Sequence, residues 1–537
     1  MKKSFYLIIL FTLLLGACAP AAAPAAEPAA PTAAPAEAAA PTQAPAAAEP
    51  TKAPEPAAAP AEVKPVVVAN AFDVNTLDSA QMSSMFNRSV IYWMFDCLVM
   101  NDREGKPMPE LATEWKRVDP LTWEFKLVQN AKFHNGEPVN SAAVKFSLDR
   151  MGNEENKSYS TLHMRGFYKE VKIIDDYTFQ IITEKPSENM MWHLAQAFIV
   201  EPKWYTEHDA EFVAKNPMGS GPYKFVEWVK DNRIVVTANE DYFQGPPKIK
   251  DVVVRIIPES SSRINELIVG NVDLLPSIPG DLAKQADSDN SRLVQFQSLR
   301  KMFVGIQLGK DGPEALKKLE VRQAMNYAID RKSLIDAYLL GGSESLRGVV
   351  NPPNTNPDIV AYDYNPEKAK ELLAKAGYPD GFEVTLQTQA SAYGPDKEIN
   401  QVIKQNLEQV GIKVNLEIVE PAKFQEVHKG KNFPGLLYFG LGTYNSPEIE
   451  LNTFTCGYVD NSFNYCNEEF GKVLDELTVT ADPAKRLELA NKAEAIVWND
   501  TPWIYLWRLP YFLGMSNRFE YEPYLDNYID MWQASLK

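Results

Sequence analysis

The sequence predicts an α/β fold for residues 66–537, divided into at least two lobes. Strand-like apolar runs alternate with amphipathic helix patterns through this part of the chain, as where residues 382–387 are followed by residues 399–410. The segment is longer than one hydrophobic core usually serves, which predicts more than one lobe. No internal repeat is evident in it.

Short strands dominate the first half of this segment. Asn140 or Ser141 is expected to cap a helix there, because Val144, Leu148 and Met151 then share one helical face. Asp175 and Asp176 form the expected turn of a hairpin. The strands predicted in this half are residues 66–68, 123–128, 171–174, 177–182, 234–237 and 252–257.

The second half shows clearer helical signals. Residues 321–329 place apolar side chains at helical spacing, and Asp330 is positioned to cap the helix that follows. Asn365-Pro366 and Asp482-Pro483 are typical helix starts, and Gly377 ends the first of these two helices. The other predicted elements are strands at 382–387 and 412–419 and a helix at 399–410.

The N-terminus carries a targeting signal. Lys2 and Lys3 precede an apolar run at 5–15, which is too short to span a bilayer but has the length of a signal-peptide core. The run ends in Leu-Gly-Ala-Cys, which resembles the lipobox of bacterial lipoproteins. The resemblance implies removal of residues 1–17 and acylation of Cys18. The alternative is an ordinary secretory signal with a chance cysteine.

Residues 18–65 are predicted to be a disordered linker. Ala and Pro dominate the composition after Cys18, and the many prolines exclude a continuous helix. Polyproline-II conformation is expected through much of it. A long tether would let the folded part search near a membrane partner; the alternative is an inert spacer.

The net charge limits the possible binding partners, and the cysteines indicate one disulfide and one free thiol. The net charge of −17 argues against nucleic acid and against direct contact with an anionic membrane surface. Cys456 and Cys466 lie in one Gly-, Asn- and Tyr-rich loop and are predicted to form a disulfide in an oxidising compartment. Cys97 lies in an apolar stretch and is expected to be a buried, inert thiol.

An ordered set of motifs extends over most of residues 66–537. Each motif is weak by itself, but together they resemble the family-5 extracellular solute-binding proteins, the peptide- and nickel-type receptors of ABC importers. The motifs are residues 75–78, 96–99, 109–115, 123–127, 132–139, 216–223, 239–243, 270–274, 321–331, 365–369 and 376–378.

The resemblance implies a hinged, two-lobed protein that binds a ligand between its lobes and delivers it to permease and ATPase subunits. Lobe I would comprise residues 66–298 and 503–537, with an inserted subdomain at 109–211, and lobe II residues 299–502. Residues 302–307 and 503–507 would cross between the lobes as the hinge. Closure would occur because the ligand contacts both lobes only in the closed form. The implied location is the outer face of the cytoplasmic membrane, and we expect a monomer.

Recognition of the ligand's amino group departs from the family pattern. In peptide-binding relatives an aspartate in a Trp-x-Ala-Asp-Tyr-x-x-Pro stretch holds that group, and residues 440–447 match the stretch with Thr443 at the aspartate position. A hydroxyl is a poor partner for a buried ammonium. This counts against a peptide held by its free amino group, unless Glu448 or Glu450 takes over that role.

The same register implies a set of ligand-binding residues. For Phe303 and Tyr505 the alternative is packing within the hinge core, and for Met85 it is helix packing. The implied residues are Ser83, Met85, Ser277, Phe303, Thr443, Tyr444, Asn445 and Tyr505.

Two ligand classes remain open, a short peptide held mainly through its main chain and an oligosaccharide stacked on Trp and Tyr rings. No metal or other cofactor is expected, because the five histidines show no paired ligand spacing. A secreted hydrolase is disfavoured by the absence of His-Glu-x-x-His, Gly-x-Ser-x-Gly and phosphate-loop motifs, although a carboxylate pair for glycosidase chemistry cannot be recognised from sequence. A sensory receptor would need a separate signalling partner.

Overall fold

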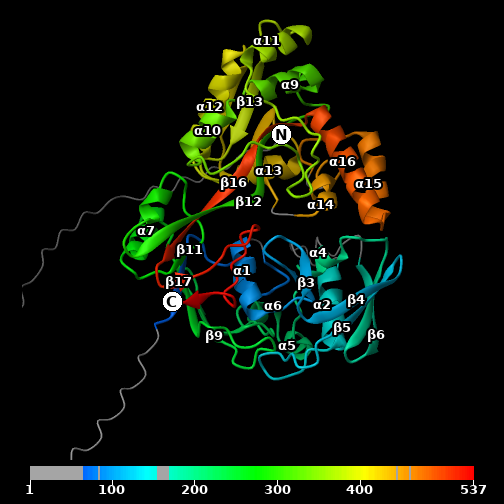
Figure 1. Ribbon diagram of the computed structural model, residues 1–537, viewed down its shortest axis with the longest axis vertical. Coiled ribbons are helices and arrows are strands. Elements are labelled where there is room, and N and C mark those ends of the chain that lie inside the picture. Colours follow the sequence, from blue (N-terminus) through cyan, green and yellow to red (C-terminus); the bar gives the residue numbers. More distant parts are fainter. Residues whose placement is uncertain (1–63, 83–84, 154–167, 443–444, 459–460) are drawn as a thin grey trace, which may run out of the picture. The chain divides into compact units, whose positions relative to one another are not determined.

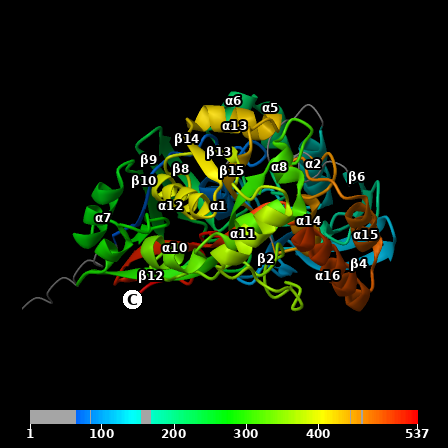
Figure 2. The ribbon, with the colours of Figure 1, turned by 90° about the horizontal axis from the view of Figure 1, so that it is seen from above.

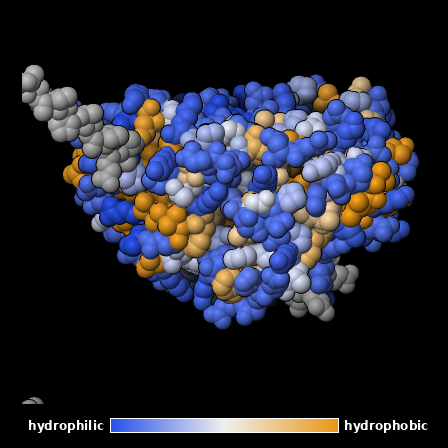
Figure 3. All heavy atoms as spheres, turned by 90° about the horizontal axis from the view of Figure 1, so that it is seen from below, coloured by the Kyte–Doolittle hydropathy of each residue, from blue (hydrophilic) through white to orange (hydrophobic). Residues whose placement is uncertain are grey.

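The computed structural model describes residues 64–82, 85–153, 168–442, 445–458 and 461–537 (Figure 1). The predicted signal sequence, Cys18 and nearly all of the predicted linker therefore lie outside the described residues. Within the described part, no helix is both long and apolar enough to cross a membrane. The face in Figure 3 is mostly hydrophilic, with hydrophobic side chains gathered in a few patches.

One mixed sheet of ten strands extends through both lobes. Its two longest strands are antiparallel neighbours at its centre and run between the lobes (Figure 1). In spatial order the strands are β14 (Lys413–Ile418), β13 (Glu383–Thr388), β15 (Leu436–Leu441), β12 (Ser291–Ile306), β16 (Trp503–Ser516), β11 (Leu274–Leu275), β1 (Val66–Asn70), β10 (Asp251–Ile256), β9 (Arg233–Ala238) and β8 (Tyr223–Val229).

Lobe I packs on the half of this sheet from β11 to β8. The β-branched side chains of β1, β9 and β10 form its core together with Trp93 and Phe95, which are fully buried. The other elements of the lobe are α1 (Met85–Met94), α7 (Ser260–Ile268), the 3-10 helix η1 (Ala283–Ala286), β17 (Phe519–Glu520) and β18 (Ser535–Leu536).

The predicted inserted subdomain has a sheet and a core of its own. Strands β4, β5, β7 and β6 form an antiparallel sheet in that order, and the rings of Phe125 and Phe179 stack at its centre with centroids 5.4 Å apart. Asn140 caps the helix behind this sheet by accepting from Ala143 N at 3.0 Å, as the sequence predicts. The elements of this region are β2 (Val99–Asn101), β3 (Pro107–Pro109), β4 (Ala112–Asp119), β5 (Thr122–Leu127), α2 (Ser141–Gly152), β6 (Tyr168–Asp175), β7 (Thr178–Thr183), α4 (Met190–Leu194), α5 (Pro202–Glu207) and α6 (Ala210–Val213).

Lobe II surrounds strands β13 to β15 with helices. Asp330, Asn365 and Asp482 cap three of them through side-chain oxygens, as the sequence predicts. The helices are α8 (Glu314–Lys317), α9 (Leu319–Tyr327), α10 (Arg331–Tyr338), α11 (Pro366–Lys375), α12 (Asp396–Gln409), α13 (Pro421–Gly430), α14 (Pro447–Asn452), α15 (Glu468–Val479) and α16 (Pro483–Asp500). In Figure 2, α10 and α12 lie toward the left of the view and α15 and α16 toward the right. The predicted two-lobed α/β fold is confirmed.

The change from one lobe to the other falls within β12 and β16. The apolar residues at positions 503–507 and 509 of β16 pack in the cores of lobe II, whereas Phe512, Leu513 and Met515 pack in those of lobe I. The regular pairing of the two strands is interrupted between Gln297 and Lys301. The boundary in β16 therefore lies inside the strand and not at residue 503, because one continuous strand serves both cores.

Candidate functional site

The carboxyl ends of parallel strands mark the candidate site in each lobe. In lobe I, β1 runs parallel to β10 and β11, and in lobe II, β13 runs parallel to β14 and β15. In open α/β sheets ligands bind outside the carboxyl ends of the strands. The segments that follow β11, β13 and β15 contain Ser277, Tyr393 and Asn445 respectively.

Direct contacts join the two lobes near Asn445. Its side-chain Nδ2 donates to the backbone oxygen of Glu104, and a Cβ at Gly105 would lie 2.9 Å from the Asn445 Cβ. Ser446 Oγ lies 3.0 Å from Asn189 Oδ1 and shares its one hydroxyl proton between this acceptor and Glu448. The Oδ1 of Asn445 is buried and accepts no hydrogen bond in the described part of the chain. Asn445 therefore lies where the lobes meet and keeps an acceptor for a further donor.

Only some of the other predicted ligand-binding residues lie in the described part of the chain. Ser277 is exposed directly after β11, a position open to a ligand. Ser83, Thr443 and Tyr444 lie outside the described residues, and Met85 is described only as the first residue of α1. For these four residues the ligand-binding role remains a prediction.

Phe303 and Tyr505 are packed inside lobe II. The Phe303 ring stacks on Trp503 with centroids 3.7 Å apart, and the Tyr505 ring stacks on Trp498 at 4.0 Å. Both side chains are fully buried. Their rings therefore pack in the hinge core, which is the alternative role stated for them above. We do not include them among the candidate ligand-binding residues.

The two glutamates that could replace the missing aspartate are already paired. Glu448 forms an ion pair with Arg486, and its Oε2 is the second acceptor near Ser446 Oγ, at 2.9 Å. Glu450 forms a buried ion pair with Lys301 and accepts from the backbone nitrogen of Asn351 at 2.9 Å. Burial raises the pKa of Glu450, and the Lys301 charge opposes that shift. Neither carboxylate is therefore available to a ligand ammonium in this arrangement.

A cation and an aromatic ring occupy the lobe II side of the hinge. The guanidinium carbon of Arg300 lies 5.7 Å from the centroid of the Tyr393 ring. Arg300 Nη1 and the Tyr393 hydroxyl both donate to the backbone oxygen of Gly440 at 3.3 Å. Arg300 is half-buried on β12, at the interruption of the strand pairing. Sequence reasoning missed this cluster, because its members come from three separate segments.

A second pair of rings lies on the lobe I side of the hinge. Phe296 of β12 and Tyr511 of β16 stack with centroids 5.7 Å apart, and both are half-buried. Burial raises the pKa of Tyr393 on the lobe II side, and the Arg300 charge opposes that shift. The sequence signal for this pair was the apolar pattern of two crossing strands, which does not distinguish core from site.

Two further ion pairs are found, one in the subdomain and one in lobe II. Arg117 pairs with Glu188 in the subdomain, and Arg486 pairs with Glu448 in lobe II. Burial lowers the pKa of Arg486, the charge of Glu188 opposes that shift, and the charge of Arg117 adds to it.

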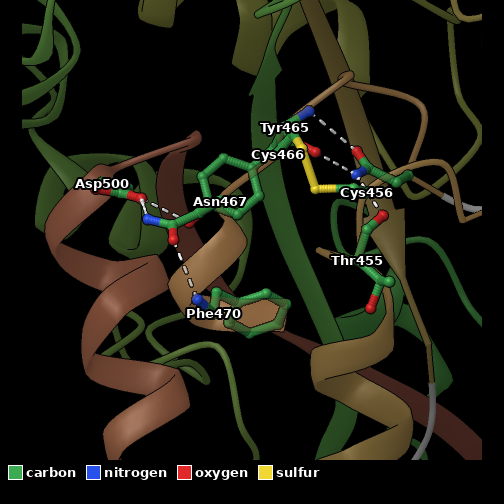
Figure 4. Close-up of a disulfide and its surroundings, with 8 residues drawn as sticks. Thr455, Cys456, Tyr465, Cys466, Asn467, Phe470 and Asp500 are labelled. Atoms are coloured by element: carbon green, nitrogen blue, oxygen red, sulfur yellow. Dashed lines mark hydrogen bonds between the residues drawn. A yellow bond between two sulfur atoms is a disulfide. The ribbon is translucent and has the colours of Figure 1, made fainter. Parts of the chain in front are cut away.

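Cys456 and Cys466 are joined in a disulfide with an S–S distance of 2.02 Å (Figure 4). Asn461 Nδ2 donates to the backbone oxygens of Thr455 and Tyr465, which holds the loop between the two cysteines. Cys97 is a buried free thiol, as expected.

The described histidines have structural surroundings. Burial lowers the pKa of His134 and of His428 to about 4. His134 Nε2 lies 3.0 Å from the backbone oxygen of Gly221, and the His428 ring stacks on Phe439 at 4.3 Å. Within the described residues, no group of His, Cys, Asp and Glu side chains is arranged to hold a metal ion.

Two lobes joined by two strands, with the carboxyl ends of parallel strands in each lobe and contacts between lobes beside them, are typical of hinged solute-binding proteins. The family model described as bacterial extracellular solute-binding proteins, family 5, matches residues 106–462. The chain belongs to this family, whose members serve ABC importers, and the resemblance found in the sequence is thereby confirmed.

Three relatives illustrate the range of the family. The chain is 29% identical over 466 residues to the glutathione-binding protein GsiB of Pectobacterium atrosepticum, covering 82% of this chain and 88% of that one. It is 29% identical over 434 residues to heme-binding protein A of Haemophilus influenzae, covering 74% and 78%. It superposes on the periplasmic binding protein DppA of Helicobacter pylori, solved with the peptide STSA, with a TM-score of 0.75 at 24% identity, covering 88% and 98%. These relatives are binding proteins.

Proposed function

We propose that this protein is the lipid-anchored, monomeric receptor of an ABC importer and that it captures a short peptide between its lobes. Family membership supports the transport role. A relative named as glutathione-binding and a fold neighbour solved with a peptide support a peptide-class ligand. The lobes would close on the peptide and present the closed form to the permease and ATPase subunits.

The observation that carries this proposal is the pairing of Glu448 with Arg486 and of Glu450 with Lys301. With Thr443 at the aspartate position and both nearby carboxylates neutralised, the peptide would be held through its main chain and not through its α-amino group. The buried Oδ1 of Asn445 supplies an acceptor for a peptide N–H group. Blocking the amino group of the peptide should therefore cost little affinity.

A thermal-shift screen tests this. Di- to penta-peptides would be compared with their N-acetylated forms and with cello-, manno- and xylo-oligosaccharides. We expect both peptide forms to raise the melting temperature of the protein, by similar amounts, because binding to the folded state stabilises it. A rise with free-amino peptides alone would contradict main-chain recognition. A rise with oligosaccharides alone would contradict the peptide proposal.

The stacked rings of Phe296 and Tyr511 favour an oligosaccharide as the second candidate. Half-buried aromatic faces on the hinge can stack on sugar rings. If this candidate holds, Tyr511→Ala should abolish the oligosaccharide-induced rise in melting temperature while peptides give none in the parent protein.

The proposed anchor rests on the lipobox at residues 15–18. Cys18→Ser should move the protein from the detergent phase to the aqueous phase in a Triton X-114 partition of expressing cells. Retention of the variant in the detergent phase would contradict lipidation at Cys18.

A further inference from the structure

The hairpin tip between β2 and β3, residues 102–106, is shaped by hydrogen bonds within lobe I. Asp102 Oδ1 accepts from the backbone nitrogens of Glu104 at 2.9 Å and of Lys106 at 2.8 Å, and Asp102 N donates to the backbone oxygen of Lys106 at 2.8 Å. An aspartate that binds the backbone of its own turn in this way fixes the conformation of that turn. The shape of the tip therefore does not depend on contact with lobe II.

Arg103 attaches the tip to the C-terminal segment of lobe I. Its Nη1 donates to Glu522 Oε2 at 2.6 Å and its Nη2 donates to Gln533 Oε1 at 3.0 Å. Its guanidinium carbon lies 5.7 Å from the centroid of the Tyr524 ring, and Tyr524 packs in the lobe I core. A planar guanidinium that is held by two acceptors and a ring has little freedom to move. We therefore expect the tip to move with lobe I when the lobes open or close.

Asn445 is held in place on the side of lobe II. It lies just before α14, and two ion pairs attach that helix to the rest of the lobe. Glu448 of α14 pairs with Arg486 of α16. Glu450 of α14 pairs with Lys301 of β12. The tip and Asn445 are thus each positioned by contacts within their own lobe.

The tip and Asn445 fit each other closely. Asn445 Nδ2 donates to the backbone oxygen of Glu104. Gly105 has a φ of +84°, and a Cβ added to it would lie 2.9 Å from Asn445 Cβ and 3.1 Å from Asn445 Nδ2. Glycine is therefore required there both for the turn and for the close approach of Asn445. In the open form water would bind the same carbonyl and amide groups, so the net gain from this hydrogen bond is modest. Little ordering cost opposes it, because both groups are already fixed.

We propose that residues 102–106 are a latch that favours the closed arrangement of the lobes by direct contact with Asn445, also when no ligand is bound. The contact joins a backbone carbonyl of one lobe to a side-chain amide of the other, so it can form without a ligand. A bound ligand then needs to supply only the remainder of the free energy of closure. The inference concerns the open–closed equilibrium of the protein itself, and it holds for a peptide and for an oligosaccharide alike.

Small-angle scattering of the ligand-free, full-length chain tests the latch, with all variants made in the Cys18→Ser background so that no lipid is attached. The protein is unfolded in guanidinium chloride without reductant, dialysed and refolded, which removes any ligand carried through purification. Asn445→Asp keeps the size of the side chain but places a carboxylate oxygen opposite the Glu104 carbonyl. We expect a larger radius of gyration than in the parent protein, with the ratio of open to closed forms raised about two- to ten-fold, because one hydrogen bond is lost. Asn445→Ala adds neither charge nor bulk and should act in the same direction by a smaller amount.

Gly105→Ala should open the lobes through steric contact with Asn445. Its matched control is Gly270→Ala, also in lobe I, where φ is +79° and an added Cβ would have no neighbour within 4 Å. Both variants carry the strain of a side chain at a left-handed position, so we expect similar losses in melting temperature but a larger radius of gyration in Gly105→Ala alone.

An unchanged radius of gyration in folded Asn445→Asp would overturn the latch, as would an equal rise in Gly105→Ala and Gly270→Ala. If Gly105→Ala does not fold, the two Asn445 variants decide. Because no ligand is added, none of these results bears on the proposed function.

Discussion

Arg300 and Lys301 are adjacent cations on β12 with contrasting surroundings. Lys301 is buried and pairs with Glu450, which Asn351 also holds through its backbone nitrogen and side-chain Nδ2. Arg300 is half-buried, lies on the Tyr393 ring and reaches the backbone of Gly440. The same strand thus contains one cation buried in an ion pair within lobe II and one that packs on a ring and a backbone oxygen where the strand passes between the lobes. Residue type alone does not tell these two roles apart.

The largest expected effect is the loss of stability on replacing Lys301. Lys301→Met should lower the free energy of unfolding by about 3–5 kcal/mol, because it leaves the Glu450 carboxylate buried without its partner. Urea unfolding followed by far-UV circular dichroism measures this. Lys301→Met combined with Glu450→Gln should regain much of the loss, and Arg300→Gln should change stability by less than about 1 kcal/mol. Equal losses for the two cations would break the contrast between them.

Glu494 is a second buried carboxylate of lobe II, and it differs from Glu450 because it accepts hydrogen bonds from two backbone nitrogens. Its oxygens accept from Val350 N at 2.8 Å and from Asn356 N at 2.7 Å, and burial raises its pKa to about 7. Because the pKa of Glu494 is higher in the folded than in the unfolded state, this carboxyl group contributes fully to the free energy of unfolding below pH 4.5. The contribution, about 3 kcal/mol, is lost as the pH rises through about 7.

Glu494→Gln should remove this part of the pH dependence, even though the amide satisfies only one of the two backbone donors. Urea unfolding between pH 4.5 and pH 8 checks the slope separately from the absolute stability. An unchanged slope in the variant would show that Glu494 does not titrate in this range.

The smallest expected effect is at the junction of the lobes. Asn189→Ala removes one of the two acceptors of the Ser446 hydroxyl, the one in the other lobe, and should destabilise the contact between the lobes by about 0.5–1.5 kcal/mol. Small-angle scattering of the ligand-free protein should show a larger radius of gyration, with the melting temperature little changed. Ser446→Ala is less suitable as a test because it would also remove the hydroxyl that lies 2.9 Å from Glu448 Oε2. A scattering curve identical to that of the parent would show that this contact does not bias closure.

The sequence by itself determined the local elements and the family. Helix starts at Asn365 and Asp482 and strands such as β1 and β13 follow from caps and hydrophobic periodicity, which act within a few residues. The ordered motifs also indicated the two-lobed fold. These signals are local or cumulative, and they do not depend on which distant segments meet.

Only the tertiary structure decided the chemistry of the site. The pairing of Lys301 with Glu450, the packing of Phe303 and Tyr505 in the core, and the meeting of Arg300 with Tyr393 join residues far apart in the chain. Each depends on the register of β12 and on the packing of the helices around it. The register decides which face of the sheet a side chain occupies, and the packing on that face decides which residue it contacts. The residue type of a carboxylate or an aromatic ring indicates what the side chain can bind. Its neighbours in the folded structure decide whether it is already paired or packed, or still available to a ligand.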